Sequence, residues 1–196
     1  MERLEKQLAL LIELDQLKSV LRRTRVKSAD GRLENSGEHS WHVALMAVLM
    51  QEHANAPVDI ARVMKMLLIH DVVEIDAGDT FVYDVAASKE QEEKEFRAAQ
   101  RLFGMLPSDQ GEELLALWHE FEAAQSNDAK YAKALDRLIP MLLNYHNDGQ
   151  SWKENGVTRE QALTINKKRI EFGSVTLWDK AKELIEDATE NGWLKS

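Results

Sequence analysis

Two apolar stretches constrain the fold of this chain more than any other feature. Residues 43–50 form its longest apolar run, residues 66–69 form a shorter one, and both lie in segments whose apolar side chains recur at helical spacing. Apolar side chains on every side of a helix are typical of a buried helix. Neither run approaches the roughly 20 residues that a membrane-spanning helix needs. We therefore expect buried core helices over 36–54 and 60–75 of a globular domain.

The rest of the chain also favours helices. Alternation with a period of two is nearly absent, and the 196 residues include only nine glycines and three prolines. Leucines of the first segment recur at steps of three and four, which is the period of an amphipathic helix. Ser36 is predicted to cap the helix over 36–54, and Asn127 or Asp128 the one over 127–145. Further helices are expected over 89–103, 109–124, 158–172 and 175–191.

The remaining segments are predicted to be loops, with the basic and then polar segment 22–37 as the longest near the N-terminus. The predicted fold is all-α: a single compact multi-helix domain over 1–196. Its core spans about 14–150, and C-terminal helices over 158–192 pack on it. The helices over 36–54, 60–75 and 127–145 are expected to form its centre.

The composition excludes several classes of function. Twenty-five Lys and Arg against 34 Asp and Glu give a net charge of −9, which argues against a nucleic-acid-binding protein because phosphate backbones require a basic face. The absence of cysteine excludes disulfides, thiol nucleophiles and cysteine-ligated metals. No signal peptide or membrane span is visible, so we expect a cytoplasmic protein with no membrane partner.

Four polar residues stand where apolar ones would be expected. His70 and Asp71 directly follow an apolar run, Asp136 interrupts an apolar helical face, and His39 lies near a predicted helix start. Imidazole and carboxylate together suit a divalent ion such as Co, Mn, Zn or Mg. Two His and two Asp would leave coordination positions for water and substrate, as in a catalytic site. The alternative is that each is an ordinary hydrogen-bonded or surface residue.

The order of these residues resembles the HD superfamily, which is named for its adjacent His-Asp pair. The likeness covers about residues 14–150 and is closest to the subfamily of bacterial 5′-deoxynucleotidases and HD-domain-containing protein 2. It rests on the motifs Glu38-His39-Ser40, His70-Asp71-x-x-Glu74, Gly78-Asp79 and Lys133-Ala-Leu-Asp136.

That resemblance implies an HD-type helical domain that acts as a metal-dependent phosphohydrolase. The implied metal ligands are His39, His70, Asp71 and Asp136, and the implied catalytic carboxylates are Glu74 and Asp79. The implied reaction removes phosphate from a (deoxy)nucleoside 5′-monophosphate by attack of a metal-activated water. A nearby carboxylate would accept a proton from that water or return one to the leaving oxygen.

A basic cluster supplies candidates for binding the substrate phosphate. Arg22, Arg23 and Arg25 stand close together in an acidic protein, and arginine can clamp phosphate bidentately. The family has a tryptophan beside its substrate-contacting arginine, whereas this chain has Thr24-Arg25-Val26-Lys27 in that stretch. Which arginine meets phosphate therefore stays open, as does the alternative of a solvated basic loop.

Two other functions and the assembly also stay open at this stage. The same site would suit a phosphodiesterase or a pyrophosphohydrolase acting on a signalling nucleotide. A non-catalytic helical module that binds nucleotides and keeps metal for stability is the other alternative. The amphipathic outer helices, with Trp178 and Trp193, would suit either a homodimer or packing of the last helix onto its own domain.

Overall fold

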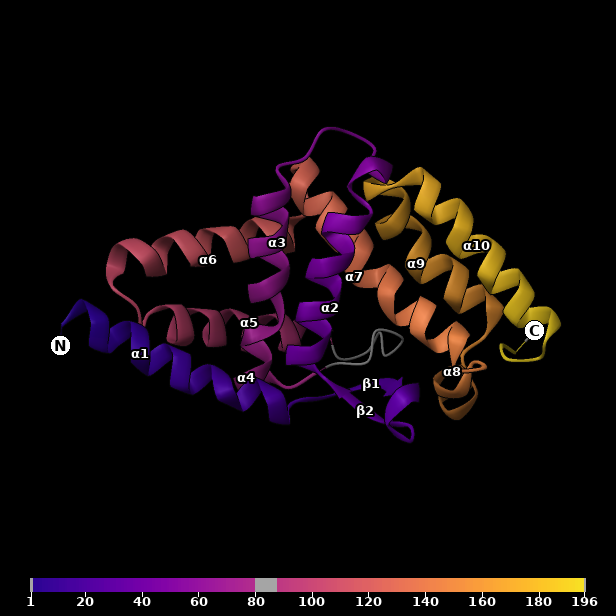
Figure 1. Cartoon of the computed structure of the whole chain (residues 1–196), viewed down its shortest axis with the longest axis horizontal. Coiled ribbons are helices and arrows are strands. Elements are labelled where there is room, and N and C mark those ends of the chain that lie inside the picture. The colour runs from indigo at the N-terminus through magenta and orange to yellow at the C-terminus, as the bar shows by residue number, and fades with distance from the viewer. Residues whose placement is uncertain (1, 80–87, 196) are drawn as a thin grey trace.

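Helices make up most of the molecule, as the spacing of its apolar residues predicts. The computed structural model describes residues 2–79 and 88–195 (Figure 1). Its α-helices are α1 (Arg3–Glu13), α2 (Ser36–Leu49), α3 (Ile60–Ile69), α4 (Glu74–Ala77), α5 (Ser88–Phe103), α6 (Ser108–Ala123), α7 (Asn127–His146), α8 (Gln150–Asn155), α9 (Arg159–Gly173) and α10 (Val175–Glu190). The described residues also form the 3₁₀ helices η1 (Leu14–Ser19), η2 (Lys27–Ala29), η3 (Gln51–His53) and η4 (His70–Val73), and the strands β1 (Leu21–Val26) and β2 (Arg32–Asn35). The all-α fold class is confirmed.

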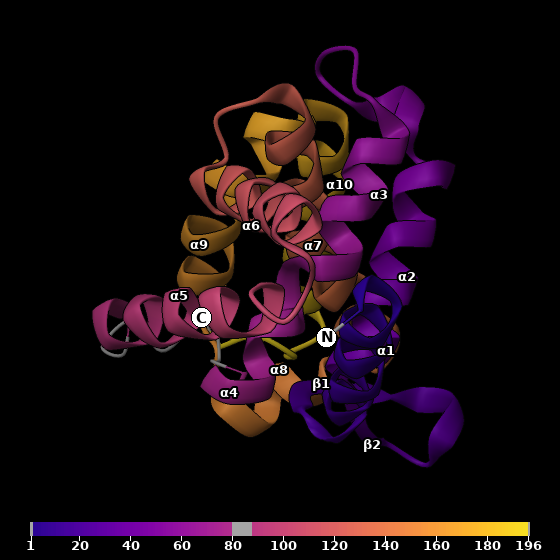
Figure 2. The same cartoon turned by 90° about the vertical axis from the view of Figure 1, so that its left-hand side faces the viewer.

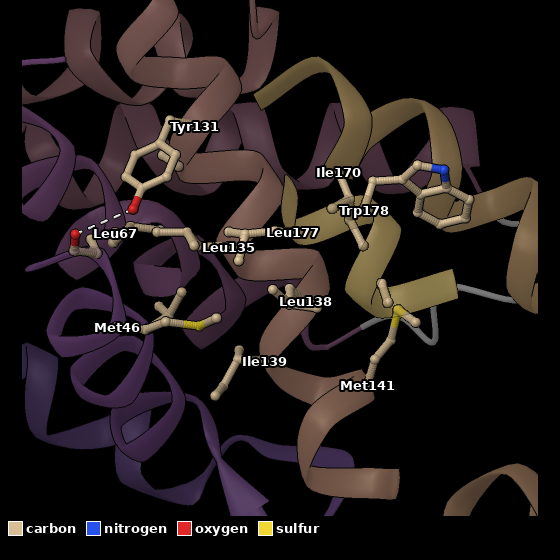
Figure 3. Close-up of a cluster of buried hydrophobic side chains, with 14 of the residues drawn as sticks. Met46, Leu67, Tyr131, Leu135, Leu138, Ile139, Met141, Ile170, Leu177 and Trp178 are labelled. Carbon is tan, nitrogen blue, oxygen red and sulfur yellow. Dashed lines mark hydrogen bonds between the residues drawn. The ribbon is translucent and has the colours of Figure 1, made fainter. Parts of the chain in front are cut away.

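Helix α7 runs through the centre of the main core. Helices α2 and α3 pack on one side of it, and α9 and α10 on the other (Figure 1). Figure 3 shows Leu135 and Leu138 of α7 between Met46 and Leu67 on one side and Ile170 on the other. The helices predicted to form the centre therefore do so. Among the described residues, no helix has both the length and the apolarity to cross a bilayer.

The expectation that α2 and α3 are buried on every side is wrong. Their inner faces are fully buried at Val43, Ala47 and Met66, but Leu49 and Leu68 are exposed. An apolar sequence on all sides of a helix predicts complete burial, but the core covers only the inner side of α2 and of α3. An apolar outer face is left on this side of the molecule.

A second apolar cluster lies under the N-terminal segment. Leu10 of α1 and Leu17 of η1 pack with Leu102, Phe103 and Trp118 of α5 and α6. The regular stripe of leucines does not continue as one buried face, because the α-helix ends at Glu13 and a 3₁₀ helix follows. The exposed leucines of α1 remain on its other side.

The predicted loop over 22–37 is instead mostly a β-hairpin. Strands β1 and β2 pair antiparallel, with Arg25 opposite Leu33 and a register irregularity between Leu21 and Arg25. Asp30 and Gly31 both have positive φ, at 53° and 74°, which favours a turn that reverses the chain tightly. Short irregular strands carry little period-two signal, so the sequence pattern did not reveal them. The hairpin directs β1 and β2 toward the end of α2 that holds His39.

Several predicted helix boundaries move by a few residues. Asn35, not Ser36, caps α2, and Ser126 caps α7 with its hydroxyl accepting from the Ala129 N–H at 3.2 Å. The helix expected over 60–75 ends at Ile69 and continues as a 3₁₀ turn and the short α4. Helix α8 was not predicted, since six residues are too few for a periodic pattern.

The two C-terminal helices belong to the same core as α7. Trp178 is buried in that core and Trp193 packs against it, so neither tryptophan forms an outer surface. Helix α9 approaches α7 closely at Gly173, where an added Cβ would lie 2.3 Å from the Lys130 carbonyl oxygen. The packing of the last helix on its own domain accounts for these residues.

Candidate metal centre and active site

The start of α2 fixes the position of His39. The Asn35 side chain accepts from the Glu38 N–H at 2.9 Å, and the Glu38 carboxylate accepts from the Asn35 N–H at 3.1 Å. Glu38 also pairs with Arg32 of β2 at 2.6 Å, so this motif residue caps the helix and ties it to the hairpin. His39, in the first turn of this helix, is fully buried.

The change from α3 to the turn η4 brings His70 and Asp71 to the same place. His70 Nδ1 lies 2.7 Å from the Leu67 carbonyl oxygen, so Nδ1–H donates to it. The Trp118 indole N–H donates to the His70 carbonyl oxygen at 3.2 Å and holds the turn from the other side. With Nδ1 protonated, Nε2 of His70 carries the lone pair that a metal requires.

Asp136 reaches both histidines from α7. Its Oδ1 lies 3.0 Å from Nε2 of His39 and 3.5 Å from Nε2 of His70. One ligand atom from each of these three residues lies within 4.8 Å of the others. Asp71 completes the group, with Oδ1 3.0 Å from Nε2 of His70 and Oδ2 3.8 Å from Nε2 of His39.

These buried groups perturb one another's protonation. Burial alone would raise the pKa of Asp136, but its close contacts with the two histidines hold it well below its usual range. Burial, and then the positive charge of Arg22, lowers the pKa of His39 to about 4. Burial opposes protonation of His70, yet the charge of Asp71 raises its pKa. A cluster of imidazole and carboxylate groups that compete for protons suits a cation.

The donor set fits a divalent ion. The buried Nε2 of His70 makes no hydrogen bond, although buried polar atoms nearly always have a partner. Two imidazole nitrogens and carboxylate oxygens are ligands that zinc, manganese, cobalt and magnesium accept to different degrees. His39, His70, Asp71 and Asp136 are therefore the residues of this chain that would hold such an ion.

Arg22 lies beside the metal centre, surrounded by carboxylates. One of its guanidinium nitrogens is 2.6 Å from Oδ2 of Asp71 and 3.8 Å from carboxylate oxygens of both Glu74 and Asp79. Burial opposes its charge, but the nearby carboxylates, Asp71 first, raise the pKa of Arg22 above its ordinary value. This arginine stays charged next to the ion site.

The two candidate catalytic carboxylates are held next to Arg22. Ser36 donates its hydroxyl to Glu74 at 2.5 Å. Burial, and then the negative charge of Asp71, raises the pKa of Glu74 to about 9, and burial also raises the pKa of Asp79. Glu74 is thus able to hold a proton at neutral pH.

This geometry accompanies a family match over most of the chain. A sequence model of the HD domain family matches residues 14–178. The chain belongs to the HD domain family. The predicted resemblance is confirmed at that level.

Curated relatives of this HD domain have names that state an activity. The 5′-deoxynucleotidase HDDC2 of Bos taurus is 33% identical over 128 residues, covering 65% of this chain and 60% of the relative. The protein of the same name from Homo sapiens is 31% identical over 127 residues, covering 65% of this chain and 61% of the relative. The chain thus spans about three fifths of the length of these relatives.

Solved structures resemble the whole HD domain. A crystal structure titled as a predicted metal-dependent phosphohydrolase from Magnetospirillum magnetotacticum MS-1 is 48% identical, with a TM-score of 0.93 over 99% of this chain and 96% of that one. A conserved hypothetical protein from Pyrococcus furiosus is 20% identical with a TM-score of 0.62, over 93% of this chain and 99% of that one. The second likeness concerns the fold alone.

A cavity of about 330 Å³ opens from the metal centre of the HD domain. His70, Asp71 and Asp136 line one part of it, together with the carboxylates Glu74 and Asp79. Strand β1 and helices α5, α6, α7, α8 and α9 contribute most of the remaining wall. Its volume is in the range of small-molecule sites.

The three candidate substrate arginines lie in different surroundings. Arg22 and Arg23 line the cavity. Arg25 is not among the lining residues, and its guanidinium pairs with Glu154 at 2.9 Å and donates to the Gly31 carbonyl oxygen at 2.8 Å. The register irregularity between Leu21 and Arg25 interrupts the regular alternation of side chains in β1, and Arg25 meets the turn and α8 instead of the cavity.

Sequence reasoning missed several polar residues at the site. Glu34 and Ser36 are buried beside it, and Lys133 pairs with Glu122 at 2.8 Å over the Phe121 ring. Asn144 and Asn166 are buried and line the cavity. On α7 a signal existed, because Lys133 and Asn144 recur with Asp136 at helical spacing. Glu34 lies in a strand that was itself not predicted.

Proposed function

We propose that this HD domain is a metal-dependent phosphohydrolase that releases phosphate from (deoxy)nucleoside 5′-monophosphates, in particular 2′-deoxyribonucleotides. The observation that carries the proposal is the convergence of His39 with His70, Asp71 and Asp136, the last three of which line a cavity that Arg22 also lines. The names of the relatives from Bos taurus and Homo sapiens support the choice of substrate. The name of the bacterial crystal structure supports the reaction class.

In this proposal the four converging side chains hold one divalent ion. When bound, the ion supplies positive charge for a phosphoryl oxygen and makes water more acidic near neutral pH. Its identity stays open among cobalt, manganese, zinc and magnesium, because nitrogen and oxygen ligands accept several of these ions. The HD domain's own task is to fix the ligands, which the capping of α2 and the Leu67–His70 hydrogen bond do.

Two arginines position the phosphate in the proposed reaction. Arg22 is already held between carboxylates at the metal centre, and Arg23 lines the same cavity from the next position of β1. A guanidinium donates two parallel N–H groups to phosphate, which orients it as well as neutralising charge. We leave Arg25 out of the proposed phosphate site, because its partners lie on the hairpin turn and α8.

Glu74 and Asp79 handle protons in the proposed reaction. Both lie within 3.8 Å of the Arg22 guanidinium, which places them next to where the phosphate would bind. One carboxylate accepts a proton from the attacking water, and one returns a proton to the leaving 5′-oxygen. The Ser36 hydroxyl fixes the orientation of Glu74.

The shape of the cavity suits a nucleoside attached to the phosphate. Asp136 and Asn144 both line it from α7, and eight residues of helix correspond to about 12 Å. That rise is comparable to the distance from the phosphate of a nucleotide to the far edge of its base. The buried side chains Asn144, Trp152 and Asn166 would then meet the base.

A phosphate-release screen tests the proposal. The protein, stripped of metal and then loaded separately with each of the four ions, is incubated with 2′-deoxy- and ribonucleoside 5′-monophosphates. We expect inorganic phosphate from at least one deoxyribonucleotide and none without metal. Release of a monoester from cyclic or diester substrates, or of pyrophosphate, would instead indicate the alternative reactions. A silent screen with metal bound would contradict the phosphohydrolase and favour a non-catalytic nucleotide-binding module.

We also propose that two copies of the chain associate through an apolar face. Helices α1 and α2 lie on the same side of the molecule (Figures 1 and 2). The face consists of their exposed apolar side chains: Leu4, Leu8, Leu11, Ile12, Trp41, Leu45, Val48 and Leu49. A gathering of exposed large apolar side chains on one side of a molecule is typical of an interaction surface. A second copy provides a matching apolar face by symmetry.

A further inference from the structure

A buried carboxylate on the hairpin lies beside the metal centre and has no assigned role. Glu34, on β2, is only 3% exposed, and it stands directly before Asn35, the residue that caps α2. Its position is fixed from both sides, by the pairing of β2 with β1 and by the start of the helix that carries His39. A charge-bearing side chain at such a place is costly unless partners compensate for its burial.

Three buried polar atoms near Glu34 make no hydrogen bond. They are Oε2 of Glu34, Nδ1 of His39 and Nε of Arg22. The Glu34 oxygen lies 3.8 Å from each of the two nitrogens. That separation exceeds a hydrogen bond by less than about 1 Å. One acceptor therefore stands within a small movement of the Arg22 Nε–H donor and of a ring nitrogen that carries a proton when Nε2 of His39 binds metal.

The two histidines of the metal centre differ in whether their Nδ1 atom has a hydrogen-bond partner. His70 already donates Nδ1–H to the Leu67 carbonyl oxygen, which leaves its Nε2 free to bind metal. His39 directs Nε2 toward Asp136, but no described group accepts a hydrogen bond from its Nδ1. A histidine that binds metal through Nε2 carries its proton on Nδ1, and that proton almost always has an acceptor.

We propose that Glu34 is a positioning residue that accepts hydrogen bonds from Nδ1–H of His39 and Nε–H of Arg22 when the centre holds its metal. The inference rests on the proposed metal set. Glu34 would fix the tautomer and ring orientation of one metal ligand, as Leu67 does for His70. It would also link that ligand to the arginine proposed to bind phosphate, so metal and substrate binding would share one carboxylate.

Metal affinity without substrate tests this role directly. Competition with a chromophoric chelator gives the affinity for Co²⁺ or Zn²⁺ of the wild type, Glu34→Gln and Glu34→Met. We expect Glu34→Met to bind metal about 10- to 100-fold more weakly, which is typical for loss of such an acceptor. Glu34→Gln keeps one acceptor oxygen and should lose less. Glu183→Gln is the control, since it makes the same kind of change at an exposed carboxylate of α10, and its metal affinity should match the wild type.

Kinetics on the metal-saturated variants separate positioning from general stability. Loss of the contact to Arg22 should raise KM for the phosphate ester in Glu34→Met, with partial recovery in Glu34→Gln. A wild-type metal affinity in both Glu34 variants would overturn the inference while leaving the metal set intact. If Glu34→Met does not fold, a wild-type affinity in Glu34→Gln together with an unchanged KM has the same meaning. A wild type that binds no divalent ion would overturn the metal set and this inference together.

Discussion

Asp136 is the residue on which the metal centre depends most, since its carboxylate contacts both histidines. We expect Asp136→Asn to weaken metal binding at least about 100-fold, because it replaces an anionic ligand with a neutral amide while keeping the size of the side chain. Elemental analysis after dialysis and phosphate release should fall together. Asp187→Asn on α10, whose carboxylate accepts from Tyr145, is the control. A metal-replete, active Asp136→Asn would contradict the ligand assignment.

Glu74 tests the division between holding metal and moving protons. Glu74→Gln keeps the shape and an oxygen for the Ser36 hydroxyl, but it removes the proton-transfer group. We expect kcat to fall about 10²- to 10⁴-fold, the usual contribution of a positioned acid or base. Metal content should stay at the wild-type level. If the variant loses its metal instead, Glu74 is a ligand and its proposed role is wrong.

For single residues, the sequence reveals a site residue when that residue interrupts an expected pattern. His70, Asp71 and Asp136 are polar residues in otherwise apolar helical segments, so the sequence alone marks them as unusual. Glu34 is equally buried, yet it lies in a polar segment where a further acid attracts no notice. Arg25 stands close to Arg22 in sequence, but the irregular strand β1 gives Arg25 partners on the turn and on α8.

Among the elements, helices α7 and α9 approach each other so closely that Gly173 has no room for a side chain. An added Cβ at Gly173 would meet the Lys130 carbonyl oxygen at 2.3 Å and the Ala134 Cβ at 2.6 Å. We expect Gly173→Ala to lower the free energy of unfolding by about 1–3 kcal/mol, since backbone must shift to make room. Urea unfolding measures it, with exposed Lys168→Ala on the same helix as control. Equal stability of the two variants would show that α9 shifts freely.

Long helices could be predicted from the sequence, and short elements could not. Each of α2, α3, α7, α9 and α10 is long enough to repeat its apolar pattern several times. The hairpin, η4 and α8 have between three and six residues per segment, and local turn geometry rather than periodicity decides their form. These short elements carry much of the site, since η4 holds His70 and Asp71 and the hairpin holds Arg22. The site was thus easier to predict by residue type than by local structure.

For the molecule as a whole, the apolar face on α1 and α2 predicts a dimer. Light scattering coupled to size exclusion should give about twice the 22.4 kDa mass of the chain. Leu45→Glu at the centre of α2 should give a monomer, because it places a charge in the apolar contact. Phe172→Glu, on an exposed part of α9 outside that face, should remain dimeric. A wild type that elutes as a single chain would contradict the proposed association.

The hydrogen bond from His70 to Leu67 connects this outer surface to the chemistry inside. Leu67 is the last residue but two of α3, which packs against α2, and α2 carries part of that outer surface. A second copy that stiffens α2 and α3 from outside would therefore also restrain the His70 ring. Specific activity should therefore decline when the enzyme is diluted until its copies separate, even with every ligand of the ion intact.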